Sequence, residues 1–110
     1  GYVLYNQNNV EKSVEYLKKA LELDPENATA QNSLGYILAE EEMDLQEALN
    51  YCKNAVRQKM EHPAYLDSLG WVYYRLKRYD EALTYLKKAF SLSGGNKTIS
   101  SHLREVMQKV

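Results

Sequence analysis

The sequence contains the stretch NSLGYIL at Asn32–Leu38 and a close copy of it, DSLGWVY, at Asp67–Tyr73. The glycines of the two copies are 35 residues apart. A Gly-Tyr pair at residues 1–2 stands 34 residues before the first of these glycines and begins a third copy. A motif that recurs at nearly the same interval indicates a chain built from repeated structural units, each with a place for a glycine and an aromatic residue.

A second motif has the same period. YLKKALEL at Tyr16–Leu23 returns as YLKKAFSL at Tyr85–Leu92, with YCKNAVRQ at Tyr51–Gln58 between them. Within each period, apolar residues recur every three or four positions, which is typical of helices. Clusters of Pro, Gly and Asn separate these segments. We therefore predict helices over residues 1–7, 10–23, 27–41, 45–59, 63–77, 79–92 and 96–109.

The glycine of each copy lies inside a predicted helix, where glycine costs about 1 kcal/mol relative to alanine. We infer that packing compensates for this cost, because a small residue lets two helix backbones approach at their crossing point. In the partner helix, we expect Ala48 to face Gly35. Ala82 is expected to face Gly70 in the same way. Cys52 stands where the sister units have leucine, so it is predicted to be a core residue.

The stretch LDSLGWVYYRLKRYDEALTYLKKA at residues 66–89 resembles the tetratricopeptide repeat (TPR) proteins, and their bacterial members in particular. Their signature is W-x2-L-G-x2-Y, followed by A-x3-F and a proline, in a repeat of about 34 residues. The stretches from Gly1 to Pro25 and from Gln31 to Cys52 follow the same signature. The match departs from the family at the Trp place, and also at the Pro place, which holds Met60 and Gly94.

This resemblance implies an all-α fold, namely an α-solenoid of antiparallel helix pairs with about three TPR units and a C-terminal capping helix. The predicted single domain divides into a truncated first repeat at 1–26, a second repeat at 27–61, a third repeat at 62–95 and the capping helix at 96–110. In the capping helix Arg104 replaces the glycine. His102 lies close to this arginine and is expected to be solvated.

The aromatic residue after each glycine points about 100° away from the helix crossing. In TPR proteins the first helix of each pair lines a concave surface that holds peptides or helices, so the resemblance implies a protein or peptide partner on this face. Tyr and Trp often anchor such interfaces. An alternative, compatible with the first, is that these rings pack against the neighbouring helix. The predicted partner-binding residues are Tyr2, Tyr5, Asn6, Asn32, Tyr36, Ala39, Glu40, Asp67, Trp71, Tyr74 and Arg75.

The carboxylate clamp of chaperone-binding TPR proteins is not expected here, because Asp67 would repel a carboxylate. A peptide with apolar or aromatic residues and a basic group is a better match. The alternative function is a structural or assembly role, in which another copy or another part of the same protein fills the groove. Because the sequence starts at Gly1, inside a predicted repeat, we also expect a possible homodimer through the N-terminal end.

Composition excludes several other classes of function. The 110 residues are 45% apolar and 26% charged, with no apolar run near the ~20 residues that span a bilayer, so direct membrane insertion is not expected. A net charge of −1 argues against nucleic acid as a partner and against RNA-binding pentatricopeptide repeats. The single cysteine and two separated histidines predict no metal site. Without a phosphate loop or nucleophile motif, we expect no cofactor and no enzymatic activity.

Overall fold

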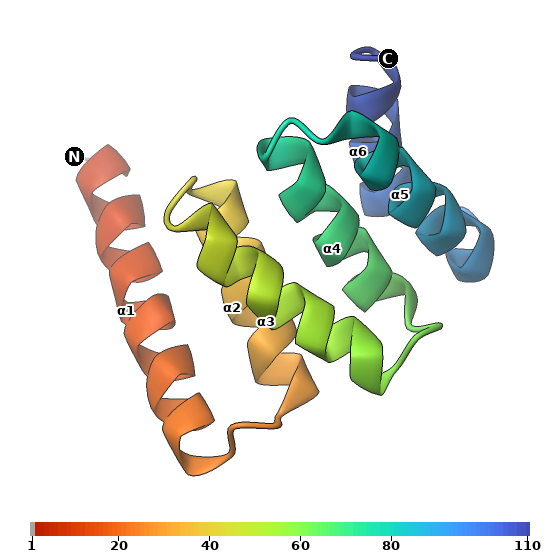
Figure 1. The fold of residues 1–110 in the computed structure, drawn as a ribbon. Coiled ribbons are helices and arrows are strands. Elements are labelled where there is room, and N and C mark those ends of the chain that lie inside the picture. The colour runs from red at the N-terminus through yellow and green to blue at the C-terminus, as the bar shows by residue number, and fades with distance from the viewer. Residues whose placement is uncertain (1) are drawn as a thin grey trace.

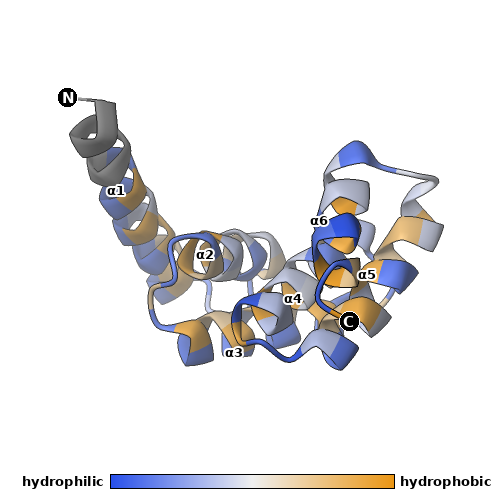
Figure 2. Cartoon of the chain, turned by 90° about the horizontal axis from the view of Figure 1, so that it is seen from above, coloured by the Kyte–Doolittle hydropathy of each residue, from blue (hydrophilic) through white to orange (hydrophobic). Residues whose placement is uncertain are grey.

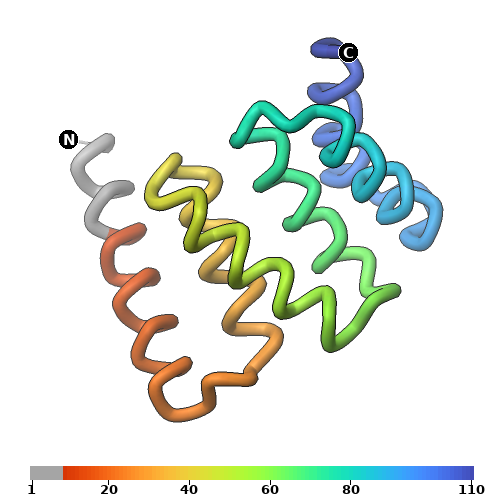
Figure 3. Tube along the Cα trace, viewed as in Figure 1, coloured from red at the N-terminus to blue at the C-terminus, as the bar shows by residue number. Residues whose placement is uncertain are grey.

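The computed structural model describes the backbone of residues 2–110 and the side chains of residues 9–110. These residues form a series of helices in which each helix packs against the next (Figure 1). Their bounds are α1 (Tyr2–Leu23), α2 (Ala28–Glu40), α3 (Leu45–Gln58), α4 (Pro63–Arg75), α5 (Tyr79–Ser93) and α6 (Lys97–Met107). The chain advances as hairpins, with α2 beside α3 and α4 beside α5 (Figure 3). The predicted all-α solenoid is confirmed.

The beginning of the chain differs from the prediction. Separate helices were predicted over residues 1–7 and 10–23, but one helix of 22 residues runs from Tyr2 to Leu23. The predicted break falls at residues 8 and 9, which are both asparagines. Neither Gly nor Pro lies inside α1, and the two asparagines at this point lower helix propensity only slightly. No local signal therefore ends the helix there.

Capping residues explain where the later helices begin and end. Asn27 and Asp44 each accept a hydrogen bond from the backbone N–H three residues on, at 2.9 and 3.1 Å. Asn96 accepts backbone hydrogen bonds from Thr98 and Ile99 at the start of α6. Gly94 ends α5 with a φ of 70°, a left-handed conformation that glycine adopts without strain. His62 occupies the N-cap place of α4 but makes no side-chain capping bond.

Two glycines of the repeated motif, Gly35 and Gly70, lie at tight helix crossings, as predicted. A Cβ atom added to Gly35 would lie 2.5 Å from Sγ of Cys52 and 3.0 Å from the carbonyl oxygen of Ala48. One added to Gly70 would lie 2.8 Å from Cγ of Leu86. These distances are shorter than van der Waals contact, so only glycine fits without a shift of its neighbours. Cys52 is completely buried, which confirms its place in the core.

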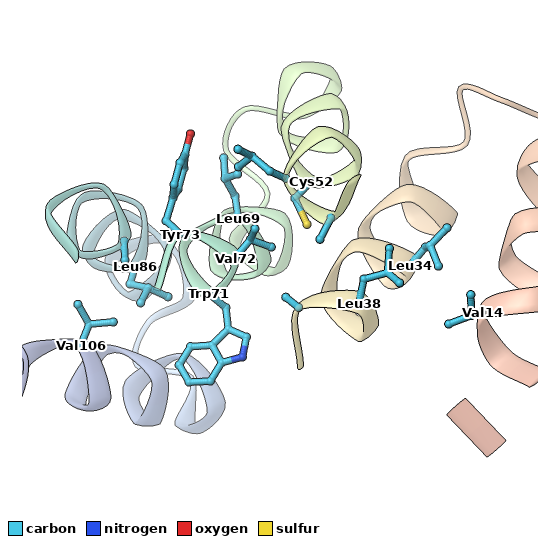
Figure 4. Packing of buried hydrophobic residues seen from close by; sticks show 14 residues of the cluster. Val14, Leu34, Leu38, Cys52, Leu69, Trp71, Val72, Tyr73, Leu86 and Val106 are labelled. Atoms are coloured by element: carbon cyan, nitrogen blue, oxygen red, sulfur yellow. The ribbon is translucent and has the colours of Figure 1, made fainter. Parts of the chain in front are cut away.

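The core follows the inner sides of the hairpins. It contains leucine and valine side chains from α2, α4, α5 and α6, together with Cys52 of α3 (Figure 4). The largest fully buried side chains are Leu34, Leu66, Leu69, Leu86, Val72, Val106 and Cys52. Seen from above, the described part of α1 and helix α6 rise on either side of α2 and α4, which gives the molecule a concave face (Figure 2). Within the described residues, no helix has both the length and the apolar character needed to cross a membrane.

Candidate functional site

The concave face carries part of the set of residues predicted to bind a partner. Helix α2 contributes Tyr36 and Glu40, and α4 contributes the other contacting members of the set. Hydrogen bonds, ion pairs and ring stacking connect these side chains to one another and to α6, and the connected set is Tyr36, Glu40, Asp67, Trp71, Tyr74 and Arg75. The side chains of Tyr2, Tyr5 and Asn6 lie outside the described part of the structure.

Trp71 lies at the centre of this set and is only 6% exposed. Its ring stacks on Tyr74 on one side and on His102 of α6 on the other, with ring centroids 4.7 and 4.1 Å away. Its Nε1–H donates to Oε1 of Glu40 at 3.2 Å, and the guanidinium of Arg75 lies 5.1 Å from the ring centre. Figure 4 shows the indole against α6. The packing interpretation therefore describes Trp71 better than an open aromatic anchor does.

His102 was expected to be solvated, and this expectation is wrong because its side chain is 7% exposed. Its Nδ1 donates to the buried carboxylate of Asp67 at 2.8 Å, and its Nε2 lies 3.4 Å from the hydroxyl oxygen of Tyr36. Helix α6 lies beside α4, and this position places the histidine on the concave face. The sequence carried a usable signal, since 35 residues separate Asn32 from Asp67 and Asp67 from His102.

Glu40 connects the two central helices. It accepts hydrogen bonds from Nη2 of Arg75 at 2.7 Å, from Trp71 and, at 3.3 Å, from the hydroxyl of Tyr36. Burial alone would raise the pKa of Glu40, but the bonds from Arg75 and Trp71 outweigh it and lower the pKa. Burial, together with the nearby Glu40 carboxylate, raises the pKa of Tyr36 to about 12. The carboxylate is thus ionised and the phenol neutral near pH 7.

The remaining predicted residues differ in their access to solvent. Ala39 is completely buried and lies beneath the surface rather than on it, because α2 packs that side against neighbouring helices. Asp67 is 6% exposed and is held by His102. Tyr74 is partly exposed, and its hydroxyl donates to Glu105 of α6 at 3.3 Å. Sequence reasoning missed this glutamate as well, since it placed α6 only as a cap.

The part of the face next to α1 is more open. Asn32 is half-buried, and its Oδ1 has no hydrogen-bond partner among the described residues. Tyr36 is half-buried too, and Glu40 is exposed. A pocket of about 260 Å³ lies between α1 and α2, and it is lined by Asn9, Val10, Ser13, Tyr36, Ile37, Glu40 and Glu41.

Comparison with known families agrees with this architecture. A family model described as TPR repeat matches residues 1–41, and one described as Tetratricopeptide repeat matches residues 63–96. The chain belongs to the TPR proteins. A TPR repeat-containing protein of Pseudomonas aeruginosa is 32% identical over 99 residues, which is 90% of this chain. The chain spans only 17% of the length of that relative.

Solved TPR domains have the same fold. The TPR domain of Arabidopsis OM64 superposes with a TM-score of 0.81 at 23% identity, covering 100% of this chain and 90% of that domain. The first TPR of Spaghetti (RPAP3), solved with the HSP90 peptide SRMEEVD, gives 0.80 at 17% identity, covering 99% and 86% of the two chains. TPR solenoids present extended concave binding surfaces, and the family is generally one of protein-interaction modules rather than catalysts.

Proposed function

We propose that this TPR protein is an interaction module that holds a peptide or a helix of a partner protein on its concave face. The observation that carries the proposal is the contrast in burial on that face. Trp71 is covered by α6, whereas Tyr36 remains half-buried beside the pocket of about 260 Å³. An aromatic ring with one side packed and one edge open is a frequent interface anchor.

The open side chains would contact the partner, and they are Asn32, Tyr36, Glu40, Tyr74 and Arg75. Trp71 and Asp67 would support the contact surface without touching the partner, because their hydrogen bonds hold Glu40 and His102 in place. This division reduces the set of partner-binding residues expected from the sequence, which included Trp71 and Asp67.

The charge of the face indicates which peptides suit it. The peptide bound to the related Spaghetti domain, SRMEEVD, is acidic. Here Glu40 and Glu41 lie at the open part of the face, where a second carboxylate would be repelled. We therefore propose a partner segment with apolar or aromatic residues and a positive charge, and not one held by a carboxylate clamp.

A random peptide library displayed on phage tests this function without a known partner. We expect selected peptides to lose about thirtyfold in affinity with Tyr36→Ala, because removal of an interface anchor typically costs about 2 kcal/mol. Tyr16→Ala is the matched control, since Tyr16 is 73% exposed on α1 and does not line the pocket. Binding that is insensitive to Tyr36→Ala, or equally sensitive to both variants, would contradict the proposal.

The alternative is an assembly role, in which another copy or another part of a longer protein covers the array. The observation in its favour is that α1, the first helix of the array, leaves Tyr16 73% and Leu23 90% exposed. The predicted homodimer through the N-terminal end can be tested by light scattering over a dilution series. A mass that falls from dimer to monomer on dilution would support self-association, and a constant monomer mass would exclude it.

A further inference from the structure

The pocket between α1 and α2 has a size that suits one side chain. Its volume of about 260 Å³ is just below the ~300 Å³ at which pockets for drug-sized ligands begin. Val10 and Ile37 give it apolar walls, and Ser13 lies on the side of α1. A neighbouring pocket of about 300 Å³ shares Val10 and is lined by Glu11, Glu41 and Met43. The two pockets together make an apolar strip with acidic edges.

Three features make the mouth of this pocket negative. Glu41 is exposed and forms no ion pair with the described side chains. Glu40 is ionised, although Arg75 already binds one of its oxygens at 2.7 Å. Helix α2 ends at Glu40, so the partial negative charge of its C-terminus points to the same place. Each of these features favours a cation at the mouth.

The occupant must satisfy both the apolar walls and the negative mouth. An acidic side chain would be repelled, and a purely apolar one would cover Glu41 without compensating its lost hydration. Lysine and arginine satisfy both, because their methylene stems pack on apolar surface while the charged head stays at the edge. A related pairing of a cation with both an apolar surface and Glu40 already occurs on this face, where the guanidinium of Arg75 lies 5.1 Å from the centre of the Trp71 ring and bonds to Glu40.

We propose that the α1–α2 pocket binds one lysine or arginine side chain of the partner segment, with the stem against Val10 and Ile37 and the cationic head at Glu41 and Glu40. This inference rests on the proposed function, since it assigns the partner residue that the concave face would recognise. It makes Glu41 a specificity-determining residue, although Glu41 was not among the residues predicted from the sequence.

The test repeats the phage-displayed random peptide selection on the wild-type protein and on Glu41→Gln. We expect a basic residue enriched at one peptide position with the wild type, and this enrichment lost with Glu41→Gln. In a selected peptide, replacing that lysine by norleucine, or that arginine by citrulline, should weaken binding about fivefold to the wild type. The same replacement should change binding to Glu41→Gln less than twofold.

Glu61→Gln is the matched control, because Glu61 is an exposed glutamate that does not line this pocket. It should keep the basic preference. Ser13→Leu is a second variant that fills the pocket without changing its charge, and it should remove the preference too. Circular dichroism establishes that each variant is folded before selection.

The outcomes separate this inference from the proposed function. Peptides that depend on Tyr36 but show no basic preference, or a preference that survives Glu41→Gln, would overturn the pocket assignment and leave the interaction module standing. If no selected peptide depended on Tyr36, both would fail. A basic preference lost with Glu41→Gln and Ser13→Leu but kept with Glu61→Gln would establish the pocket.

Discussion

Tyr36 and Trp71 occupy the same place in successive repeats, 35 residues apart, yet they lie in different surroundings. Trp71 is 6% exposed because α6 lies beside α4 and places His102 on its ring. Tyr36 lies on α2, whose neighbour α1 leaves a pocket beside it. A place in the repeat therefore sets the direction of a side chain, while the neighbouring helix decides whether that side chain is covered.

The two halves also differ in how they use charge. In the half closed by α6, Asp67 bonds to His102, and Arg75 bonds to both Glu40 and Glu42. In the half next to α1, Glu41 has no such partner among the described side chains. Internal pairing stabilises the closed half, and the unpaired charge of the open half remains available to a ligand.

The largest expected difference between the two halves is in stability. Trp71→Ala should lower the free energy of unfolding by about 3–5 kcal/mol, since it removes a buried ring and leaves a cavity. Tyr36→Ala should cost about 1–2 kcal/mol, because less of its surface is buried. Urea denaturation followed by circular dichroism measures both. Equal losses of unfolding free energy from the two variants would show that α6 does not make the surroundings of Trp71 more buried than those of Tyr36.

The contact between α6 and α4 can be broken directly. His102→Ala should cost about 2–3 kcal/mol, because the buried carboxylate of Asp67 loses its charged-group hydrogen bond. A double-mutant cycle with Asp67→Ala should show a favourable coupling energy between the two residues. Ser101→Ala, at an exposed neighbouring position, is the control. If the losses of stability from the two single variants add up to the loss from the double variant, the hydrogen bond between Asp67 and His102 does not stabilise the packing of α6 beside α4.

Smaller effects are expected at the helix crossing of the second repeat. Gly35→Ala should destabilise the protein by about 1–2 kcal/mol, because overpacking outweighs the helix propensity that alanine gains. The new methyl group would meet Sγ of Cys52 first, at 2.5 Å. Cys52→Ala should therefore recover part of the loss in the double variant. A stabilising Gly35→Ala would contradict the close crossing.

The smallest effect is a dependence on alkaline pH. Tyr36 ionises at about 12 in the folded state, against a usual pKa of 10.0. Between these values the folded protein keeps a proton that the unfolded chain has lost, so the free energy of unfolding decreases as pH rises. Tyr36→Phe should make that decrease shallower. Urea titrations at a series of pH values that starts at pH 9, below both pKa values, measure the decrease. An unchanged slope would place the Tyr36 phenol in open solvent.

Much of the fold could be predicted from the sequence, because its signals are local or periodic. The 3.6-residue pattern, the clusters of Pro, Gly and Asn between helices, and the repeated glycines all act within one helix pair. The continuous α1 was missed because the asparagines at residues 8 and 9 do not by themselves end a helix. The buried state of His102 was missed because it depends on how α6 packs beside α4, which no short motif encodes.

The candidate site was predicted in part for the same reason. Helical spacing correctly placed Tyr36, Glu40 and Trp71 on one face, because spacing fixes direction along a helix. It did not predict that Ala39, in the same stripe, would be completely buried. Glu41 was missed because it is the last residue of the predicted helix 27–41, and its proposed role depends on the neighbouring pocket, which no sequence motif shows.

The central claim is that neighbouring helices, rather than repeat position, decide which aromatic place is open. Acrylamide quenching tests it, since Trp71 is the only tryptophan of the chain. The wild type would be compared with a Tyr36→Trp/Trp71→Phe variant, which moves the single indole to the equivalent place in α2. We predict blue-shifted, shielded emission from the wild type and red-shifted, readily quenched emission from the variant. Equal quenching of the two proteins, or readily quenched wild-type emission, would contradict the account.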